Sequence, residues 1–446
     1  MKHRRDDGAN AGDHGELALR LHRFYRGKVQ VLPRCRVRDL DDFAIWYTPG
    51  VAAPSRAIAK DPELAYEHAF KWNAVAVVSD GTRVLGLGDV GPLAGLPVME
   101  GKALLFKYLG GVDAWPLCVG PGLDADDLVQ LVKWIQPTFG GVNLEDVEKP
   151  KCFRVLDALR SDPDVTIPVW HDDQQGTAAV TLAGVLNALK VVGKTPRDVR
   201  VVFFGAGASN TAIGRLLRRA GFDPKKAVYV DSRGIVHPDR GDLDEYKREL
   251  AELTNGEDLR GGPEVALSGA DVLVALSTPG PGVVKGEWVR AMADDAVVFA
   301  CANPVPEIHP RVAKAAGARV VGTGRSDFPN QVNNSLGFPG IFRGTLDVRA
   351  TTITDEMCIA AAEALAKYQE DSGRLDEDHV LPAMGDPGFV PLEAAAVGRK
   401  AVEQGVARLN LSFDELFERA DRLARAAKEA TNALMQGGFI PPAPTG

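Results

Sequence analysis

Two pairs of adjacent acids are the residues of this sequence best suited to chemistry. Glu145 and Asp146 follow the short apolar segment 140–144, and Asp172 and Asp173 follow a second apolar run. In open α/β sheets, ligands bind beyond the carboxyl ends of the strands, so acids at these positions are candidates for a functional site. A solvated Asp-Asp turn is the alternative, because burial of two like charges requires a cation, a shared proton or a basic partner.

The spacing of the two pairs predicts a metal site. Asp173 comes 27 residues after Asp146, which is close to one strand–helix unit of about 30 residues. Two neighbouring strand ends would therefore bring Glu145, Asp146 and Asp173 together. Three carboxylates with no lysine or arginine between them favour a hard divalent cation, Mg²⁺ or Mn²⁺.

Other residues suit proton transfer and substrate binding. Lys102 stands at the predicted start of the apolar helix 103–108, where the helix dipole would lower its pKa toward that of a general base. Tyr47 precedes a Pro-Gly turn that should place it at a loop edge. The guanidinium of Arg83 suits a carboxylate, and the amides of Asn303 and Asn334 suit a polyoxygenated acid. A surface, packing or turn role is the alternative for each of these five residues.

Residues 199–231 predict a dinucleotide-binding unit. An apolar strand, a glycine-containing turn, a helix and a second strand ending in an acid follow in the expected order. The residues assigned to the cofactor are Gly205, Ala206, Gly207, Ala208, Ser209, Asn210 and Asp231. Asn210 replaces the third glycine of the motif, which weakens the match.

The identity of the nicotinamide cofactor stays open from the sequence. Asp231 suits the ribose diol of NAD. Ser232 and Arg233, with Arg240 and Lys247 further on, instead suit the 2′-phosphate of NADP.

Alternating apolar strands and helices predict an α/β protein with two domains. We expect a Rossmann-type doubly wound parallel sheet domain and a second α/β substrate and metal domain completed by C-terminal helices. The predicted divisions are 1–167 for the N-terminal domain, 168–345 for the dinucleotide-binding domain and 346–446 for helices that pack back on the N-terminal domain.

Composition narrows the class of protein. The 446 residues carry a net charge of −8 and form no basic stripe, which argues against nucleic acid as a partner. No apolar run approaches the ~20 residues of a membrane span, and the basic N-terminus is not followed by the apolar segment of a signal peptide. Five scattered cysteines suit a reducing compartment. We therefore expect a cytoplasmic protein.

Seven stretches, in order, resemble the malic enzymes, particularly the small-subunit prokaryotic type. They are Y-T-P-G-V-A (47–52), D-G-T-R-V-L-G-L-G-D-V-G (80–91), E-G-K-A (100–103), L-E-D (144–146), H-D-D-Q-Q-G-T-A (171–178), A-N-P (302–304) and N-N-S-L-G-F-P-G (333–340). The resemblance implies oxidative decarboxylation of L-malate to pyruvate and CO₂ with NAD or NADP, and a homodimer.

The resemblance also implies roles for matching residues. By this resemblance, Tyr47 matches the general acid of the family and Lys102 matches its general base, with Asp172 supporting the lysine. By the same resemblance, the metal ligands of the family are matched by Glu145, Asp146 and Asp173. Arg83, Asn303 and Asn334 are similar to the groups that hold the substrate, with Asn303 also beside the cofactor. The alternatives are a malolactic-type enzyme that retains NADH, a metal-free 2-hydroxyacid dehydrogenase, and a non-catalytic dinucleotide-binding sensor.

Overall fold

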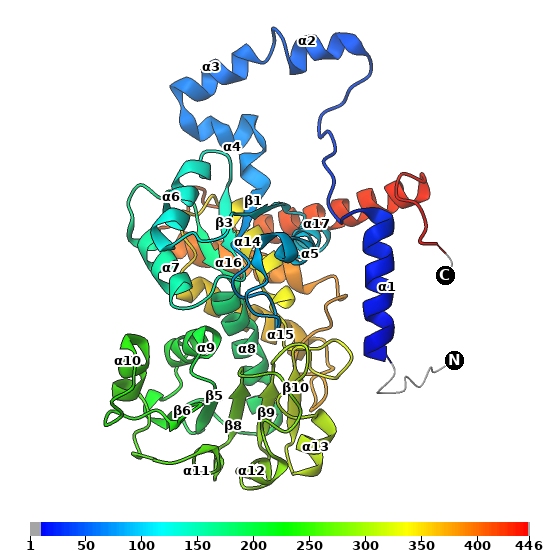
Figure 1. The fold of residues 1–446 in the computed structure, drawn as a ribbon. Coiled ribbons are helices and arrows are strands. Elements are labelled where there is room, and N and C mark those ends of the chain that lie inside the picture. The colour runs from blue at the N-terminus through cyan, green and yellow to red at the C-terminus, as the bar shows by residue number, and fades with distance from the viewer. Residues whose placement is uncertain (1–9, 445–446) are drawn as a thin grey trace.

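The molecule contains two β-sheets, one at the level of β1 and β3 and one in the lower half at β5 to β10, and helices α8 and α15 lie between them (Figure 1). The structure is a computed structural model that describes residues 10–444. The α/β class predicted from the sequence, with a Rossmann-type domain beside a second α/β domain, is confirmed.

The first sheet has four parallel strands in the order β2-β1-β3-β4. These strands are β1 (Ala74–Ser79), β2 (Asp113–Cys118), β3 (Gly141–Leu144) and β4 (Val169–His171). The helices that connect them are α5 (Gly91–Gly110), α6 (Ala125–Ile135) and α7 (Lys151–Ser161). β1 is buried throughout, as expected for a strand of a parallel sheet covered on both faces. Because β4 pairs with β3, the first sheet continues past the predicted division at residue 168 and ends at His171.

The second sheet has six strands in the order β10-β9-β8-β5-β6-β7. Its parallel strands are β5 (Val201–Phe204), β6 (Ala227–Asp231), β8 (Val272–Ala275), β9 (Val297–Ala300) and β10 (Val320–Thr323), and the short β7 (Gly234–Ile235) runs antiparallel at one edge. Its helices are α9 (Ala208–Arg219), α10 (Glu245–Leu253), α11 (Pro263–Leu267), α12 (Gly286–Arg290) and α13 (Pro310–Ala315).

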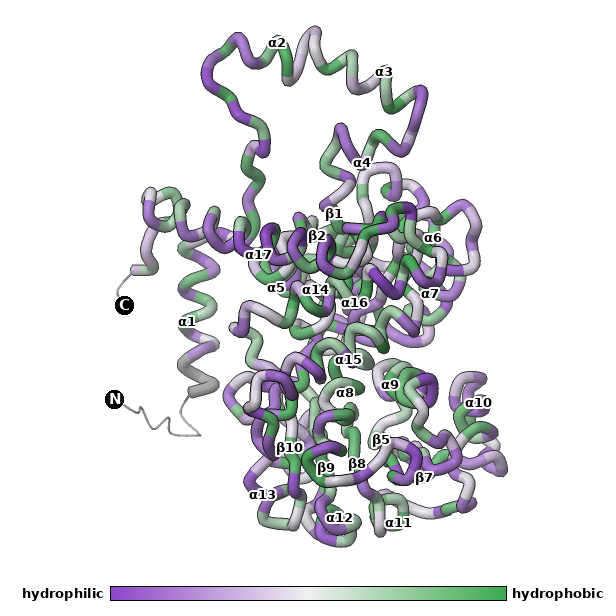
Figure 2. The backbone as a smooth tube through the Cα atoms, turned by 180° about the vertical axis from the view of Figure 1, so that it is seen from behind, coloured by the Kyte–Doolittle hydropathy of each residue, from purple (hydrophilic) through white to green (hydrophobic). Residues whose placement is uncertain are grey.

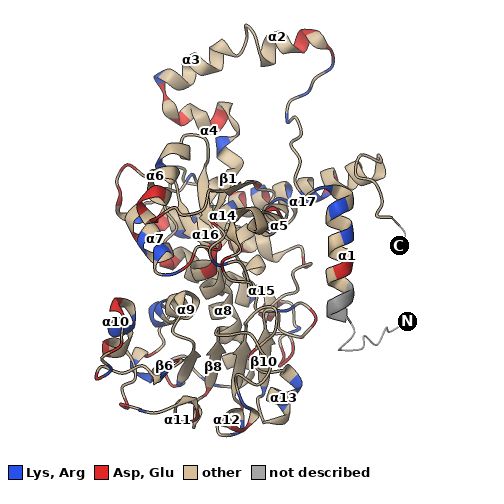
Figure 3. Ribbon diagram, viewed as in Figure 1, with Lys and Arg blue, Asp and Glu red and all other residues tan. Residues whose placement is uncertain are grey.

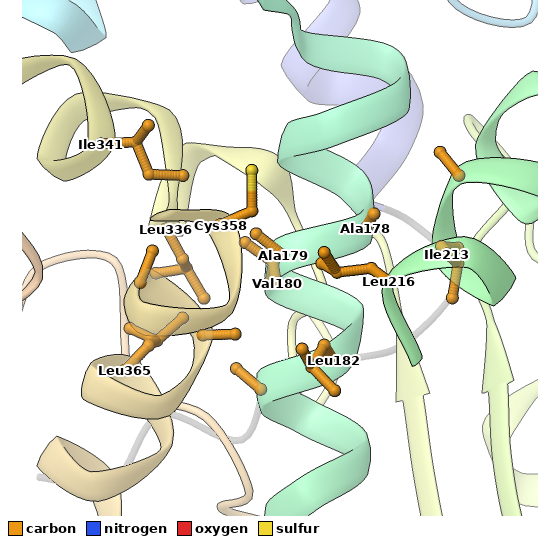
Figure 4. Packing of buried hydrophobic residues seen from close by; sticks show 14 of the residues in the cluster. Ala178, Ala179, Val180, Leu182, Ile213, Leu216, Leu336, Ile341, Cys358 and Leu365 are labelled. Atoms are coloured by element: carbon orange, nitrogen blue, oxygen red, sulfur yellow. The ribbon is translucent and has the colours of Figure 1, made fainter. Parts of the chain in front are cut away.

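Helix α8 (Asp172–Val191) joins the two sheets and is buried along most of its length. Its apolar residues pack against α9 on one side and against C-terminal segments on the other (Figure 4). The C-terminal helices are α14 (Phe338–Asp347), α15 (Asp355–Asp371), α16 (Phe389–Glu403) and α17 (Phe413–Gln436), and α14 and α17 contact α5 of the first domain. One continuous apolar core therefore spans both domains.

Hydropathy and charge follow this arrangement. β8 and α8 are largely hydrophobic (Figure 2), whereas lysine, arginine, aspartate and glutamate gather on outer helices such as α7 and α10 (Figure 3). Within residues 10–444, every helix is too short or too polar to cross a membrane.

An arm, residues 28–64, extends away from both sheets (Figure 1). It follows α1 (Asn10–Tyr25), carries the short helices α2 (Phe43–Trp46) and α3 (Ala52–Lys60), and returns to the first domain at α4 (Ala65–His68). Large apolar side chains of the arm are exposed, including Leu40, Ile45 and Trp46. Such a surface is typical of a segment that contacts another molecule.

Candidate active site

The two acid pairs meet at the carboxyl edge of the first sheet. Glu145 and Asp146 follow β3, and Asp172 and Asp173 form the first turn of α8 directly after the neighbouring strand β4. The backbone N–H of Asp146 donates a hydrogen bond of 3.0 Å to Oδ2 of Asp173. The positive end of the helix dipole favours acids in the first turn. The structure thus brings the two predicted pairs together.

Lys102 lies among these acids as a buried ion-pair partner. Its Nζ is 2.5 Å from Oδ2 of Asp172 and 2.8 Å from Oε1 of Glu145, and its side chain is 8% exposed. The ammonium also lies 4.3 Å from the ring centroid of Phe338, an attractive cation–π distance. Asp172 is completely buried, so this lysine is its compensating charge.

The predicted position of Lys102 at a helix start is wrong. Helix α5 begins at Gly91, with Pro92 in its first turn, where proline's fixed φ and missing N–H suit a helix start. Lys102 is therefore in the middle of the helix. Burial disfavours its ammonium form, but Asp172 and Glu145 outweigh burial and raise the lysine pKa. The lysine is protonated in this arrangement.

The acids carry more negative charge than one lysine can neutralise. Burial raises the pKa of Glu145 well above its ordinary value, against the opposing effect of Lys102, and the nearby aspartates raise it further. Burial and the repulsion of Asp173 likewise raise the pKa of Asp146 to about 8. The carboxyl groups at the two strand ends thus lie close enough to raise the pKa of Glu145 and of Asp146.

This donor set fits a hard divalent cation, although its side chains are not closed around one point. In the described part of the chain, no three histidine, cysteine, aspartate or glutamate side chains could hold a metal ion as they stand, since Glu145 is turned to Lys102. Oδ2 of Asp146 is buried without a hydrogen-bond partner. An unpartnered carboxylate oxygen beside two further carboxylates is the arrangement that Mg²⁺ or Mn²⁺ would relieve.

Neighbouring residues that the sequence did not identify hold the acids in place. The indole N–H of Trp170 donates to Oδ1 of Asp172 at 3.1 Å, and Nδ2 of Asn143 donates to Oε2 of Glu145 at 2.8 Å. A side chain at Gly176 would collide with Oδ1 of Asp172. The signal for Asn143 was a polar residue inside an otherwise apolar strand, two residues before Glu145.

The glycine loop of the second sheet adjoins this site. Gly205 follows β5 with φ +105°, and the loop leads into the N-terminus of α9 at Gly207 and Ala208. The hydroxyl of Ser209 donates to the backbone carbonyl of Asp173 at 2.8 Å. A phosphate-binding helix start and the acid cluster therefore lie side by side.

Asn210 has a structural reason for replacing the third glycine. Its side chain is fully buried, and its amide donates to the carbonyls of Phe204 and Gly205 at 3.1 and 2.8 Å. The buried asparagine therefore links the start of α9 to the end of β5 and to the first residue of the loop. The loop is thus held by a side-chain amide as well as by helix–strand packing.

The predicted substrate residues lie on three different segments, and two of them, Arg83 and Asn334, contact or adjoin segments of the cluster. The backbone N–H of Arg83 donates to the carbonyl of Asp146 at 3.0 Å, while the arginine side chain is exposed. A Cβ at Gly176 would lie 3.4 Å from Cβ of Asn334. Asn303 belongs to the loop after β9, and its backbone approaches Gly86 of the first domain so closely that a side chain at Gly86 would collide with it.

Glu307 is a further residue that the sequence did not reveal. Its buried carboxylate accepts from the N–H of Ser277 at 2.7 Å and from the N–H of Ala302 at 3.1 Å. It therefore ties together the loops after β8 and β9, and so fixes the segment that carries Asn303.

Tyr47 is not brought to the site within one chain. It lies on the arm, directly after α2, with 72% of its surface exposed. Asp231 is the last residue of β6, the neighbour of β5, and Ser232 and Arg233 follow it at the same edge of the second sheet as the glycine loop.

Comparisons with known proteins agree with this geometry. The family model "Malic enzyme, N-terminal domain" matches residues 26–124, and "Malic enzyme, NAD binding domain" matches residues 174–396. The chain is 47% identical to the bifunctional malic/malolactic enzyme of Bacillus subtilis, over 92% of this chain and 98% of that protein. It is 45% identical to the NADP-dependent malic enzyme of Halomonas elongata, over 84% of this chain and 90% of that protein.

A solved structure shows the same fold. The crystal structure of Entamoeba histolytica malic enzyme is 49% identical and covers 97% of this chain and 90% of its own, with a TM-score of 0.93. These comparisons cover between 84% and 97% of this chain. The chain is an oxidoreductase and belongs to the malic enzyme family.

Proposed function

We propose that this enzyme catalyses the oxidative decarboxylation of L-malate to pyruvate and CO₂, with reduction of NAD or NADP. The observation that carries the proposal is the buried Lys102, held by Asp172 and Glu145 next to the glycine loop of the dinucleotide-binding sheet. This arrangement puts a proton-transfer group beside the place where a nicotinamide would accept hydride.

Glu145, Asp146 and Asp173 would hold Mg²⁺ or Mn²⁺. When bound, such a cation stabilises the negative charge that develops on the oxygen of C2 during loss of CO₂. The mutual repulsion of these acids and the unpartnered Oδ2 of Asp146 support this assignment.

With its amine neutral, Lys102 would take the proton of the C2 hydroxyl, and a bound nicotinamide would supply the hydride acceptor for C2. Its pKa is high because two carboxylates face it, and burial alone would lower that pKa. Movement of Glu145 away from the ammonium would therefore bring the lysine toward the range of a general base. Asp172 keeps its hydrogen bond to the lysine and orients it, because the indole N–H of Trp170 holds the Asp172 carboxylate in place.

The remaining residues bind the substrate. The exposed guanidinium of Arg83, at the rim of the cluster, would bind a malate carboxylate through two hydrogen bonds. Asn303 and Asn334 would donate amide hydrogen bonds to substrate oxygens from the opposite domain, and Asn303 would also adjoin the cofactor. After the C3–C4 bond breaks, C3 needs a proton, which we assign to Tyr47.

The position of Tyr47 leads us to propose a homodimer. The arm cannot deliver Tyr47 to Lys102 of its own chain in this conformation, and the arm exposes Leu40, Ile45 and Trp46. Leu85, Leu87 and Leu93, on and beside the loop of Arg83, are exposed as well. Pairing of the arm of one copy with this rim of a second copy would cover both surfaces and complete both sites.

Isolated heterodimers test the exchange of arms. Tyr47→Phe and Lys102→Met copies, each inactive alone, would be co-expressed with different tags and purified through both. An exchanged arm restores one of the two sites, so we expect about half of wild-type activity per dimer. A heterodimer as inactive as its parents contradicts the exchange.

The reaction itself is tested with L-malate and either cofactor. We expect reduced cofactor and pyruvate in equal amounts, activity that is lost with a chelator, and activity that returns with Mg²⁺ or Mn²⁺. A malolactic reaction, which the name of the Bacillus subtilis relative suggests, would give lactate without free reduced cofactor. Activity that survives complete metal removal would contradict the metal assignment. A sensor without catalysis would bind cofactor and convert nothing.

We expect the enzyme to work in the cytoplasm without nucleic acid or membrane as a partner. All five cysteines are free thiols, which suits a reducing compartment.

A further inference from the structure

The acid that ends β6, Asp231, has an unusual role in this chain. At this position of a dinucleotide-binding sheet, an acid commonly accepts hydrogen bonds from the two ribose hydroxyls of NAD. We infer that Asp231 is instead committed to internal partners, and that the pocket beside it recognises a 2′-phosphate, so that NADP is the preferred cofactor. The inference rests on the proposed dinucleotide-dependent reaction and identifies its cofactor.

Four donors already fill the carboxylate of Asp231. Oδ1 accepts from the backbone N–H of Arg233 at 2.9 Å and from Nη1 of Arg240 at 2.8 Å. Oδ2 accepts from Nη2 of Arg240 at 3.1 Å and from Nζ of Lys247 at 2.7 Å. An ionised carboxylate offers about four acceptor positions. The hydroxyls of an NAD ribose would therefore have to displace an existing partner.

The partners of Asp231 are themselves held in place. Arg240 donates to Asp242 through Nε at 3.0 Å and through Nη2 at 2.6 Å, and its side chain is 9% exposed. Burial opposes ionisation of Asp231, but the bonds from Arg240 and Lys247 lower its pKa. The side chain of Asp231 is only 7% exposed. This is a fixed ion network, which a ligand would not reorganise without cost.

Charge at this strand end favours an anion. Three cations (Arg233, Arg240 and Lys247) face two carboxylates, those of Asp231 and Asp242. A ribose diol would bring further donors to a carboxylate that is already saturated. A phosphate monoester would bring acceptor oxygens and negative charge to a cluster with surplus positive charge.

Two exposed residues are available to contact that phosphate. Ser232 directly follows the strand and is exposed. Arg233 is 69% exposed and pairs with Asp242 through Nη1 at 3.2 Å, so most of its guanidinium can turn to a ligand. Lys247, 21% exposed, borders the same space. A serine hydroxyl, a fork of guanidinium donors and an ammonium form a suitable set for a phosphate.

The binding test uses adenosine 2′,5′-bisphosphate and adenosine 5′-monophosphate, which differ only in the 2′-phosphate. Calorimetry on the full-length enzyme should show the bisphosphate binding at least about tenfold more tightly. Equal binding of the two, or tighter binding of the monophosphate, overturns the inference. Because no malate is present, this result does not depend on the decarboxylation reaction.

Variants then assign the preference to residues. Arg233→Gln should lower kcat/KM for NADP by about 10- to 100-fold and leave NAD within about twofold. Lys247→Gln removes the ammonium that donates to Oδ2 of Asp231, so that this oxygen can accept from a ribose hydroxyl. The variant should raise kcat/KM for NAD and lower it for NADP. The matched control is Arg260→Gln, on the same domain, where the arginine pairs with Asp239 and Asp258; neither cofactor should respond. An unchanged NADP-to-NAD ratio in both Arg233→Gln and Lys247→Gln, with wild-type melting temperatures, contradicts the inference.

Discussion

Replacement of Lys102 by methionine separates its effects on stability and on catalysis. Methionine keeps the apolar stem and a similar volume, but removes the ammonium that pairs with both Asp172 and Glu145. The change leaves each of these buried carboxylates with one neutral donor, Trp170 or Asn143. The variant therefore tests whether the lysine both compensates the acids and accepts the substrate proton.

The expected magnitudes follow from burial. Removal of one member of a buried ion pair costs about 3–5 kcal/mol, since the partner charge stays in the interior. Loss of a positioned general base lowers kcat by about 10²- to 10⁴-fold. The double variant Lys102→Met/Asp172→Asn removes one stranded charge, so we expect a favourable coupling energy of about 0.5–3 kcal/mol. Its activity should stay as low as that of the single variant.

Urea unfolding measures the free energy of unfolding of the variant. A chelator is present so that no divalent cation substitutes for the missing ammonium. Unfolding is followed by the fluorescence of the six tryptophans, of which Trp170 bonds to Asp172. Initial rates with malate and Mn²⁺ measure catalysis. A variant that unfolds at the wild-type urea concentration, or that oxidises malate at the wild-type rate, would refute the role of Lys102 in the corresponding function.

Three further outcomes are expected. Asp173→Asn should raise the Mn²⁺ concentration needed for half-maximal activity by at least about tenfold, while calorimetry with the cofactor alone shows unchanged affinity; equal Mn²⁺ dependence contradicts the assigned ligand. Glu307→Gln removes one of two acceptors for the N–H groups of Ser277 and Ala302, so KM for malate should rise several-fold more than kcat falls; a fall in kcat alone would show that the loop is positioned by other contacts. The Lys71 pKa is lowered to about 8, first by burial and then by Arg408, so the fold disfavours its charged form and stability should increase as pH rises from about 8 to 10.5. The urea midpoint of the wild-type enzyme should rise over this pH range, and that of Lys71→Met should not show this rise. A fall in the wild-type midpoint over the same range would contradict the predicted direction.

Much of the fold could be predicted from local sequence. Helix α6 runs from Ala125 to Ile135, as its apolar spacing and the acids of its first turn indicate, and β1, β3 and β8 coincide with short apolar runs. These features depend on side-chain periodicity and turn chemistry, which act over a few residues. The start of α5 was missed because its first two turns contain two glycines and two prolines, a composition typical of loops.

The sequence by itself determined which strands end in acids and where a glycine loop enters a helix, because backbone preference and hydrophobic spacing are local properties. Only the tertiary structure decided the charge state of Lys102, the commitment of Asp231 to Arg240 and Lys247, and the separation of Tyr47 from the acid cluster. These outcomes depend on the directions in which side chains from distant elements point. A pattern along the sequence does not show which opposite charges form ion pairs in the interior. Those ion pairs determine the chemistry of the site.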